Sequence, residues 1–219
     1  MDHSVQNFIN IKENISLNLD RLKINKFPKI IAVSKTFKLE KILPLIEYGH
    51  FDYGENKVQE AIEKWSNIKQ KNLNLNLHLI GKLQTNKVKL AVKIFDYIHS
   101  VDSEKLAKKI CVEQEKINKN IGIFIQVNLK NETQKSGVSK CDLPDLINYC
   151  KSIKLKILGL MCIPPLNINP EISFKEMDIL NKSFNFSALS MGMSSDYLQA
   201  IQYSASHVRI GSSIFGERS

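Results

Sequence analysis

A lysine at the end of a short apolar run is the first residue whose position suggests chemistry. Lys35 follows residues 30–34, which are all apolar or small. Burial at a strand end disfavours the ammonium form and lowers the pKa of a lysine. A neutral amine is the nucleophile that forms an imine with an aldehyde, so Lys35 is a candidate covalent anchor. Spacing alone also allows a surface lysine, the commoner case in a lysine-rich chain.

Two later segments combine glycine, hydroxyl side chains and backbone N–H groups. They are residues 189–194 (LSMGMS) and 207–213 (HVRIGSS). In barrel enzymes, loops of this kind after the last two strands bind phosphate with backbone N–H groups and a short helix N-terminus. Gly211 would let the backbone approach the anion, and Ser212 would donate a hydrogen bond. Two ordinary turns remain the alternative.

Two further polar positions are candidate ligand contacts. Arg209 is one of only three arginines among 31 basic residues, and an arginine inside a strand suggests a need for a planar set of donors. An outward-facing arginine is the alternative. Asn56 follows the second predicted strand and either contacts a ligand or caps the next helix. The adjacent Glu55 either braces a neighbouring lysine or lies in solvent.

These residues must be positioned by alternating strands and helices. Short apolar runs alternate with stretches of helical spacing, which favours a parallel sheet. We predict one domain over residues 1–219, an α/β fold of the (β/α)8 TIM-barrel type, with an extra N-terminal helix within residues 1–28. A doubly wound open sheet is the second choice. The predicted strands are 29–34, 51–54, 77–81, 97–101, 121–129, 157–163, 186–190 and 207–210, and the predicted helices are 39–48, 56–69, 87–94, 103–118, 143–152, 173–185 and 196–203.

Barrel closure would bring the residues that follow each strand to one end of the molecule, where barrel enzymes place their active sites. Lys35, Asn56, Gly211 and Ser212 would then meet. His78 and His207 lie within strands and are interpreted as core or rim residues rather than metal ligands. No metal site is predicted, because the four cysteines match no zinc spacing.

Composition excludes several classes of protein. The net charge of +9 comes mainly from scattered lysines rather than a basic cluster, so we expect no nucleic-acid partner. The apolar stretches are far shorter than a membrane span, and the first residues do not resemble a secretory signal. We therefore expect a cytoplasmic protein with free thiols.

Seven segments in order along the chain together form a specific pattern. They are AVSKT (32–36), GENKVQEA (54–61), LHLIGKLQTNK (77–87), VNLKNETQKSG (127–137), GLMCIPP (159–165), LSMGMSSD (189–196) and VRIGSSIFGER (208–218). This set resembles the YggS/PROSC family of pyridoxal-phosphate-binding homeostasis proteins. Lys82, Ser204 and His207 depart from residues frequent in that family, and none is a proposed cofactor contact.

The resemblance implies the barrel of the alanine racemase N-terminal domain and a bound pyridoxal 5′-phosphate (PLP). It implies Lys35 as the Schiff-base lysine and Asn56 in the pocket. It also implies Ser190, Gly211 and Ser212 at the phosphate. Arg209 would lie beside the pyridine nitrogen and keep it unprotonated, which weakens the ring as an electron sink.

The resemblance further implies a non-catalytic carrier that buffers PLP, with PLP-dependent apo-enzymes as recipients. A racemase-like enzyme is the alternative, and it needs an acid/base group on each face of the substrate carbon. Lys35 would serve one face, and Tyr53, Tyr197 and Tyr203 are the candidates for the other. The chain has no counterpart of the second racemase domain, which favours a non-catalytic monomer.

Overall fold

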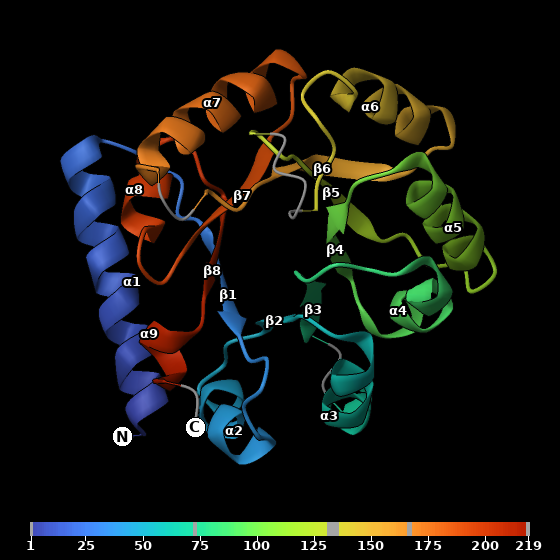
Figure 1. Cartoon of the computed structure of the whole chain (residues 1–219). Helices are drawn as coiled ribbons and strands as arrows, with labels where there is room; N and C mark the ends of the chain where they lie inside the picture. Colours follow the sequence, from blue (N-terminus) through green and yellow to red (C-terminus); the bar gives the residue numbers. More distant parts are fainter. Residues whose placement is uncertain (1, 72–73, 131–135, 166–167, 218–219) are drawn as a thin grey trace.

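The strands of the computed structural model form a closed barrel in which each strand pairs in parallel with its neighbours in sequence order. The structure describes residues 2–71, 74–130, 136–165 and 168–217. Figure 1 shows the strands at the centre of the molecule. They are β1 (Lys29–Val33), β2 (Asp52–Glu55), β3 (Asn76–Leu79), β4 (Tyr97–Val101), β5 (Gly122–Gln126), β6 (Lys156–Met161), β7 (Ala188–Met193) and β8 (His207–Ile210).

Helices surround the barrel and cover the outer faces of the strands (Figure 1). No helix within the described residues combines the length and apolarity that crossing a bilayer requires. The helices are α1 (His3–Leu22), α2 (Leu39–Glu47), α3 (Val58–Lys71), α4 (Val88–Ile94) after the short 3-10 helix η1 (Thr85–Lys87), α5 (Glu104–Glu115), α6 (Leu143–Ser152), α7 (Pro170–Ser183), α8 (Tyr197–Gln202) and α9 (Ser212–Phe215).

The predicted barrel and its extra N-terminal helix are confirmed, and the open sheet is wrong because β1 pairs with β8. Some predicted boundaries are also wrong. Strand β7 continues to Met193, three residues beyond the predicted end, because Ser190 and Gly192 resemble a loop in sequence. Strand β5 ends at Gln126, and α9 is too short at four residues to give a helical pattern.

The barrel interior holds polar and aromatic side chains beside the branched aliphatic residues that dominate the interior in most barrels of this fold. His78 stacks on Tyr97 with ring centroids 4.4 Å apart, and His99 stacks on Phe124 at 4.3 Å. Both histidines are fully buried. The apolar core between strands and helices supplies most of the hydrophobic burial, so the barrel interior is available for polar groups.

Helix α1 lies along α8 and α9, and this arrangement is visible at one side of Figure 1. Its N-terminus is capped by Asp2, whose carboxylate accepts from the Ser4 N–H at 2.8 Å. The Asn7 side chain donates to the Ile214 carbonyl at 3.0 Å, and Asn18 donates to the Leu198 carbonyl at 3.2 Å. The N-terminal helix therefore braces the two short helices that follow β7 and β8.

The buried histidines predict how stability depends on pH. Burial lowers the pKa of His50 to about 4 and of His207 to about 3, and lowers those of His78 and His99 below the usual value. Below about pH 6.5 the unfolded chain binds protons that the folded chain does not. The free energy of unfolding should therefore fall as pH drops from 6.5 towards 4, by about 1.4 kcal/mol per pH unit for each such histidine.

Urea denaturation at several pH values measures this slope. The variant His207→Met removes one of the titrating groups and should give a shallower slope than the wild-type chain. A free energy of unfolding that stays constant between pH 7 and pH 5 would contradict the prediction.

Candidate functional site

Strand pairing brings the predicted anchor lysine and the predicted phosphate loop to the same rim. In the parallel register Ala32 pairs with Ile210 and Val33 with Gly54, so the residues after β1, β2 and β8 are neighbours. A Cβ on Gly211 would lie 3.3 Å from the Val33 carbonyl oxygen. Gly211 therefore packs directly against β1, two residues before Lys35.

The turn that carries Lys35 is held by groups from β2 and α3. Lys35 is half-buried, and the next residue, Thr36, has a left-handed φ of 69°. The Thr36 N–H donates to a Glu60 carboxylate oxygen at 2.6 Å. The Lys64 ammonium donates to the Ser34 carbonyl at 2.8 Å and also contacts Glu60 at 3.0 Å. The backbone on both sides of Lys35 is thus fixed by hydrogen bonds.

Glu55 is the buried centre of this cluster. Its Oε1 accepts from the Ser34 hydroxyl at 2.7 Å, the Trp65 indole N–H at 2.9 Å and Lys64 at 3.0 Å. Burial raises the pKa of this carboxyl, and the bonds from Trp65 and Lys64 oppose the rise. Of the two alternatives for Glu55, bracing a lysine is confirmed and solvent exposure is wrong.

The loops after β7 and β8 are joined by Ser194. Its hydroxyl oxygen accepts from the backbone N–H of Gly211 at 3.2 Å and of Ser213 at 3.4 Å. The Ser213 hydroxyl donates back to the Ser194 carbonyl at 3.5 Å. Ser212 lies between the two N–H groups, is exposed, and begins α9. The two segments predicted to bind phosphate are therefore one connected structure.

Arg209 and Ser190 lie inside the barrel rather than on its rim. Arg209 is 4% exposed; it donates to the Ser190 hydroxyl at 2.7 Å and to the Cys162 carbonyl at 2.8 Å. The alternative of an outward-facing arginine is wrong. Ser190 lies within β7, and its oxygen is also 2.9 Å from His99 Nδ1. A contact of Ser190 with phosphate stays a prediction.

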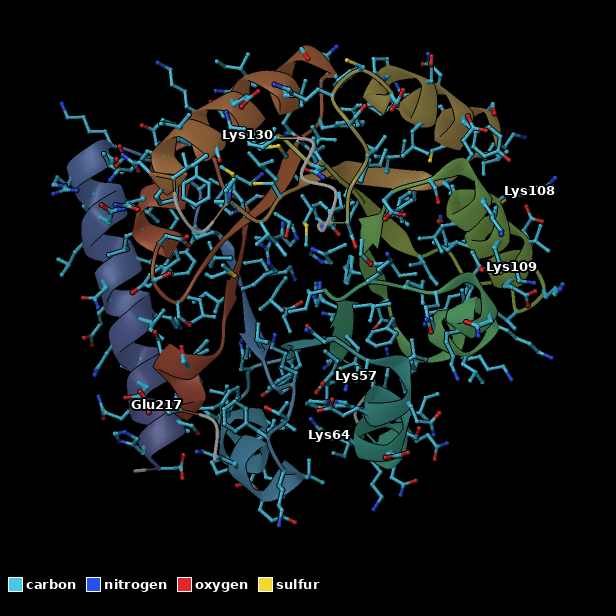
Figure 2. The ribbon with its side chains drawn as sticks, viewed as in Figure 1. Lys57, Lys64, Lys108, Lys109, Lys130 and Glu217 are labelled. Carbon is cyan, nitrogen blue, oxygen red and sulfur yellow. The ribbon has the colours of Figure 1, made fainter. Side chains whose placement is uncertain are left out.

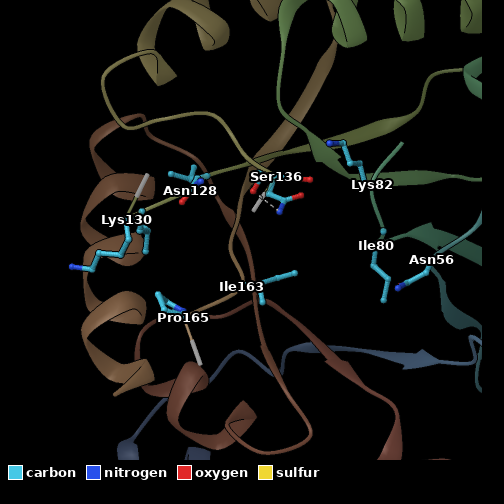
Figure 3. A pocket seen from close by; sticks show the side chains of 12 residues that line it. Asn56, Ile80, Lys82, Asn128, Lys130, Ser136, Ile163 and Pro165 are labelled. Atoms are coloured by element: carbon cyan, nitrogen blue, oxygen red, sulfur yellow. Dashed lines mark hydrogen bonds between the residues drawn. The ribbon is translucent and has the colours of Figure 1, made fainter. Parts of the chain in front are cut away.

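A cavity of about 340 Å³ opens at the carboxyl ends of the strands (Figure 3). Its size is in the range of pockets for small cofactors. Asn56 is the predicted site residue that lines it, and Lys82 and Lys130 add positive charge. A Cβ on Gly81 would lie 2.4 Å from the Asn56 carbonyl oxygen, so a glycine is needed for these loops to pack. The lining residues are Asn56, Ile80, Gly81, Lys82, Gln126, Val127, Asn128, Leu129, Lys130, Ser136, Ile163 and Pro165.

The tyrosines considered as a second acid/base group do not line this cavity. Tyr53 is buried against Trp65 and His50, with ring centroids 4.8 and 5.3 Å away. Tyr197 is buried in α8, where burial raises its pKa and Asn14 of α1 bonds its hydroxyl. Tyr203 is partly buried against the hydrophobic core.

Two residues of the site were not singled out from the sequence. His99 contacts Ser190 from β4, and Ser194 joins the two loops. The signal for Ser194 was present, since it belongs to the segment predicted to bind phosphate. His99 had no such signal, because it lies within a strand and reaches Ser190 only after closure of the barrel.

Comparison with known proteins defines the class. The family model for the alanine racemase N-terminal domain matches residues 7–219. The pyridoxal phosphate homeostasis proteins of Pasteurella multocida and Aquifex aeolicus are 35% and 40% identical over 225 and 200 residues. The alignment with the Pasteurella protein covers 97% of this chain and 97% of the relative. The alignment with the Aquifex protein covers 87% of each. PipY of Synechococcus elongatus PCC7942, solved with PLP bound, has a TM-score of 0.81 at 32% identity, covering 92% of this chain and 100% of that chain.

The barrel and its rim thus define a protein of the alanine racemase N-terminal-domain class. Within that class the chain belongs to the YggS/PROSC family of pyridoxal phosphate homeostasis proteins, as its sequence motifs indicated.

The Glu55 cluster predicts a matched pair of lysine variants. Lys64→Met should lower the free energy of unfolding by about 3 kcal/mol, because it leaves a buried carboxylate without its cation. Lys57→Met, on the same segment, changes an exposed lysine and should have little effect. Figure 2 shows both side chains near α3. Chemical denaturation measures the difference, and equal losses in the two variants would contradict the assigned role of Lys64.

Proposed function

We propose that this protein binds PLP as a Schiff base on Lys35 and acts as a non-catalytic carrier in PLP homeostasis. The observation that supports this most directly is the packing of Gly211, in the joined loops after β7 and β8, against Val33 of β1, two residues before Lys35. PLP carries an aldehyde that reacts with amines and a phosphate that accepts hydrogen bonds. The rim offers an amine for one and backbone donors for the other.

The donor groups on the rim fit each part of this cofactor. The Lys35 amine would hold the aldehyde carbon. Ser212, which lies between the two N–H groups that Ser194 holds, would donate to the phosphate, and Gly211 would let the backbone approach it closely. Ser190, the third predicted phosphate contact, is fully buried within β7, where its hydroxyl bonds Arg209 and His99. Asn56 lies in the wall of the adjoining cavity, where its amide can contact the ring substituents. When bound, the cofactor supplies an aldehyde and an electron-accepting ring.

Arg209 supports a carrier rather than an enzyme. The guanidinium only donates hydrogen bonds, so a pyridine nitrogen beside it must accept and stays without a proton. An unprotonated ring is a weaker electron sink for carbanion chemistry. Racemisation also needs a second acid/base group, and Tyr53 and Tyr197 are buried away from the cavity. Sustained racemisation of alanine that is lost in Lys35→Ala would contradict this part of the proposal.

The proposal extends to the setting of the protein. Residues 1–219 are proposed to act as one cofactor-binding domain and as a monomer in the cytoplasm. The four cysteines, Cys111, Cys141, Cys150 and Cys162, are free thiols, as expected of a protein in a reducing compartment. PLP-dependent apo-enzymes are the proposed recipients, because a reversible imine can release an aldehyde to another lysine.

Trapping of the cofactor tests the central claim. Protein mixed with PLP should absorb as an imine, and borohydride reduction should leave the cofactor on the peptide that contains Lys35. Lys35→Ala should lose both signals, whereas Lys38→Ala, which changes an exposed lysine three residues further on, should keep them. Mass spectrometry of the digested protein locates the adduct. An adduct spread over surface lysines, or unchanged in Lys35→Ala, would refute the assignment.

The loop that Ser194 holds predicts selectivity for the phosphorylated cofactor. Ser194→Ala removes the acceptor that fixes the N–H groups of Gly211 and Ser213. PLP should bind about tenfold more weakly, while pyridoxal, which has no phosphate, should be affected much less. Ser195→Ala, at the exposed neighbouring serine, is the control. Equal losses for both ligands would show that the loop does not bind the phosphate.

A further inference from the structure

A continuous line of hydrogen-bonded side chains crosses the barrel interior beneath the candidate site. Arg209 Nη1 is 2.7 Å from Ser190 Oγ, which is 2.9 Å from His99 Nδ1. His99 Nε2 is 3.0 Å from His78 Nδ1, and His78 Nε2 is 3.1 Å from Asp52 Oδ1. The same carboxylate oxygen receives the Lys29 ammonium at 2.8 Å. We call Arg209, Ser190, His99, His78 and Asp52 the interior chain.

The two ends of the interior chain determine the direction of every bond in it. Arginine only donates, and an ionised carboxylate only accepts. Bonds from His78 and Lys29 hold the pKa of Asp52 at about 2 against the opposing effect of burial. Burial lowers the pKa of His78 and of His99, so both imidazoles are neutral, with one donor and one acceptor each.

Only one set of tautomers satisfies these conditions. His78 must donate from Nε2 to Asp52, so its Nδ1 accepts from His99 Nε2–H. His99 Nδ1 is then an acceptor and takes the Ser190 hydroxyl hydrogen. The Ser190 oxygen is left with lone pairs for Arg209. Each bond donates in the same sense, from the guanidinium to the carboxylate.

Ring packing fixes the geometry of this line. His78 stacks on Tyr97 at an interplanar angle of 9°, and His99 stacks on Phe124 at 22°. Among the residues that the structure describes, no three histidine, cysteine or carboxylate side chains converge as metal ligands. His207 belongs to the same ring cluster, 5.0 Å from Phe124, but its Nδ1 bonds Ser206 and not the interior chain. His78 and His99 therefore connect Ser190 to Asp52 through hydrogen bonds of fixed direction.

Arg209 is a buried cation that needs such support. Its burial is nearly complete and lowers its pKa, which the charge of Asp196 opposes, but among the described residues no carboxylate forms an ion pair with it. The Cys162 carbonyl accepts from one of its nitrogens, next to Ile163 in the cavity wall. The Ser190 oxygen accepts from the other nitrogen of Arg209. The dipoles of Ser190, His99 and His78 are aligned with their negative ends towards Arg209, and Asp52 lies at the far end of the interior chain. Aligned hydrogen bonds in a low-dielectric interior reinforce one another.

We propose that His99, backed by His78 and Asp52, is a positioning residue for Arg209. By taking the Ser190 hydroxyl hydrogen, His99 turns the Ser190 lone pairs to the guanidinium and fixes its remaining N–H groups towards the ring nitrogen of the bound cofactor. This role rests on the proposed function, in which Arg209 lies beside the pyridine nitrogen. His99, a residue of β4 that acts through Ser190 and Arg209, would then influence whether that nitrogen is protonated.

Three variants separate positioning from mere packing. His99→Phe keeps a ring on Phe124 and removes the acceptor for Ser190. His99→Asn replaces Nδ1 with an amide oxygen and should restore that acceptor. His207→Phe is the matched control, since it changes a ring of the same cluster outside the interior chain.

The first readout is the absorption spectrum of bound PLP across a pH titration. The apparent pKa of the bound chromophore should shift by about one pH unit or more in His99→Phe. It should remain near the wild-type value in His99→Asn and His207→Phe. An unchanged titration in His99→Phe, or an equal shift in His207→Phe, would overturn the positioning role.

The second readout needs no cofactor and no variant. Nitrogen-15 NMR of the wild-type protein between pH 6 and 8 should show His78 and His99 as neutral Nε2–H tautomers. A protonated ring or an Nδ1–H tautomer at either position would refute the interior chain. If wild-type protein fails to bind PLP, the proposed function fails while this measurement still decides the direction of the bonds.

Discussion

The pairing of β1 with β8 is the interaction on which the site depends. It closes the barrel, sets Ala32 opposite Ile210, and puts Gly211 in contact with Val33. Lys35 and the loop after β8 are about 175 residues apart along the chain, and no local structure brings them together. Parallel strands all present their carboxyl ends to one rim, so closure converts distant residues into one binding surface.

The polar interior is the second requirement. A guanidinium and two imidazoles inside a barrel lose hydration, which costs free energy unless each polar group has a partner. Here Arg209 donates to Ser190 and Cys162, and His78 and His99 bond to each other and to Asp52. The apolar layer between the strands and the helices offsets the cost, because hydrophobic burial there does not depend on what fills the barrel.

The sequence predicted the barrel well because alternating strands and helices of regular length leave few topologies. It placed Lys35, Asn56, Gly211 and Ser212 on the correct rim for the same reason. It ended the seventh strand at Ser190, although β7 continues to Met193, because the glycine and serine that follow have the composition of a turn. It gave no role to His99, whose partners come from β3 and β7 and are known only after closure. Boundaries and long-range polar contacts are tertiary properties that local pattern does not encode.

The contact of α1 with α9 has a consequence for the order of folding. Asn7 bonds the carbonyl of Ile214, in the short helix whose first residues belong to the proposed phosphate loop. Contacts of such large sequence separation form late, because closing a long loop costs entropy before the contact stabilises it. A chain that has not closed its barrel therefore has Lys35 without the loop after β8. Under the proposed function, the aldehyde and the phosphate of the cofactor would be held together only by molecules that have completed their fold.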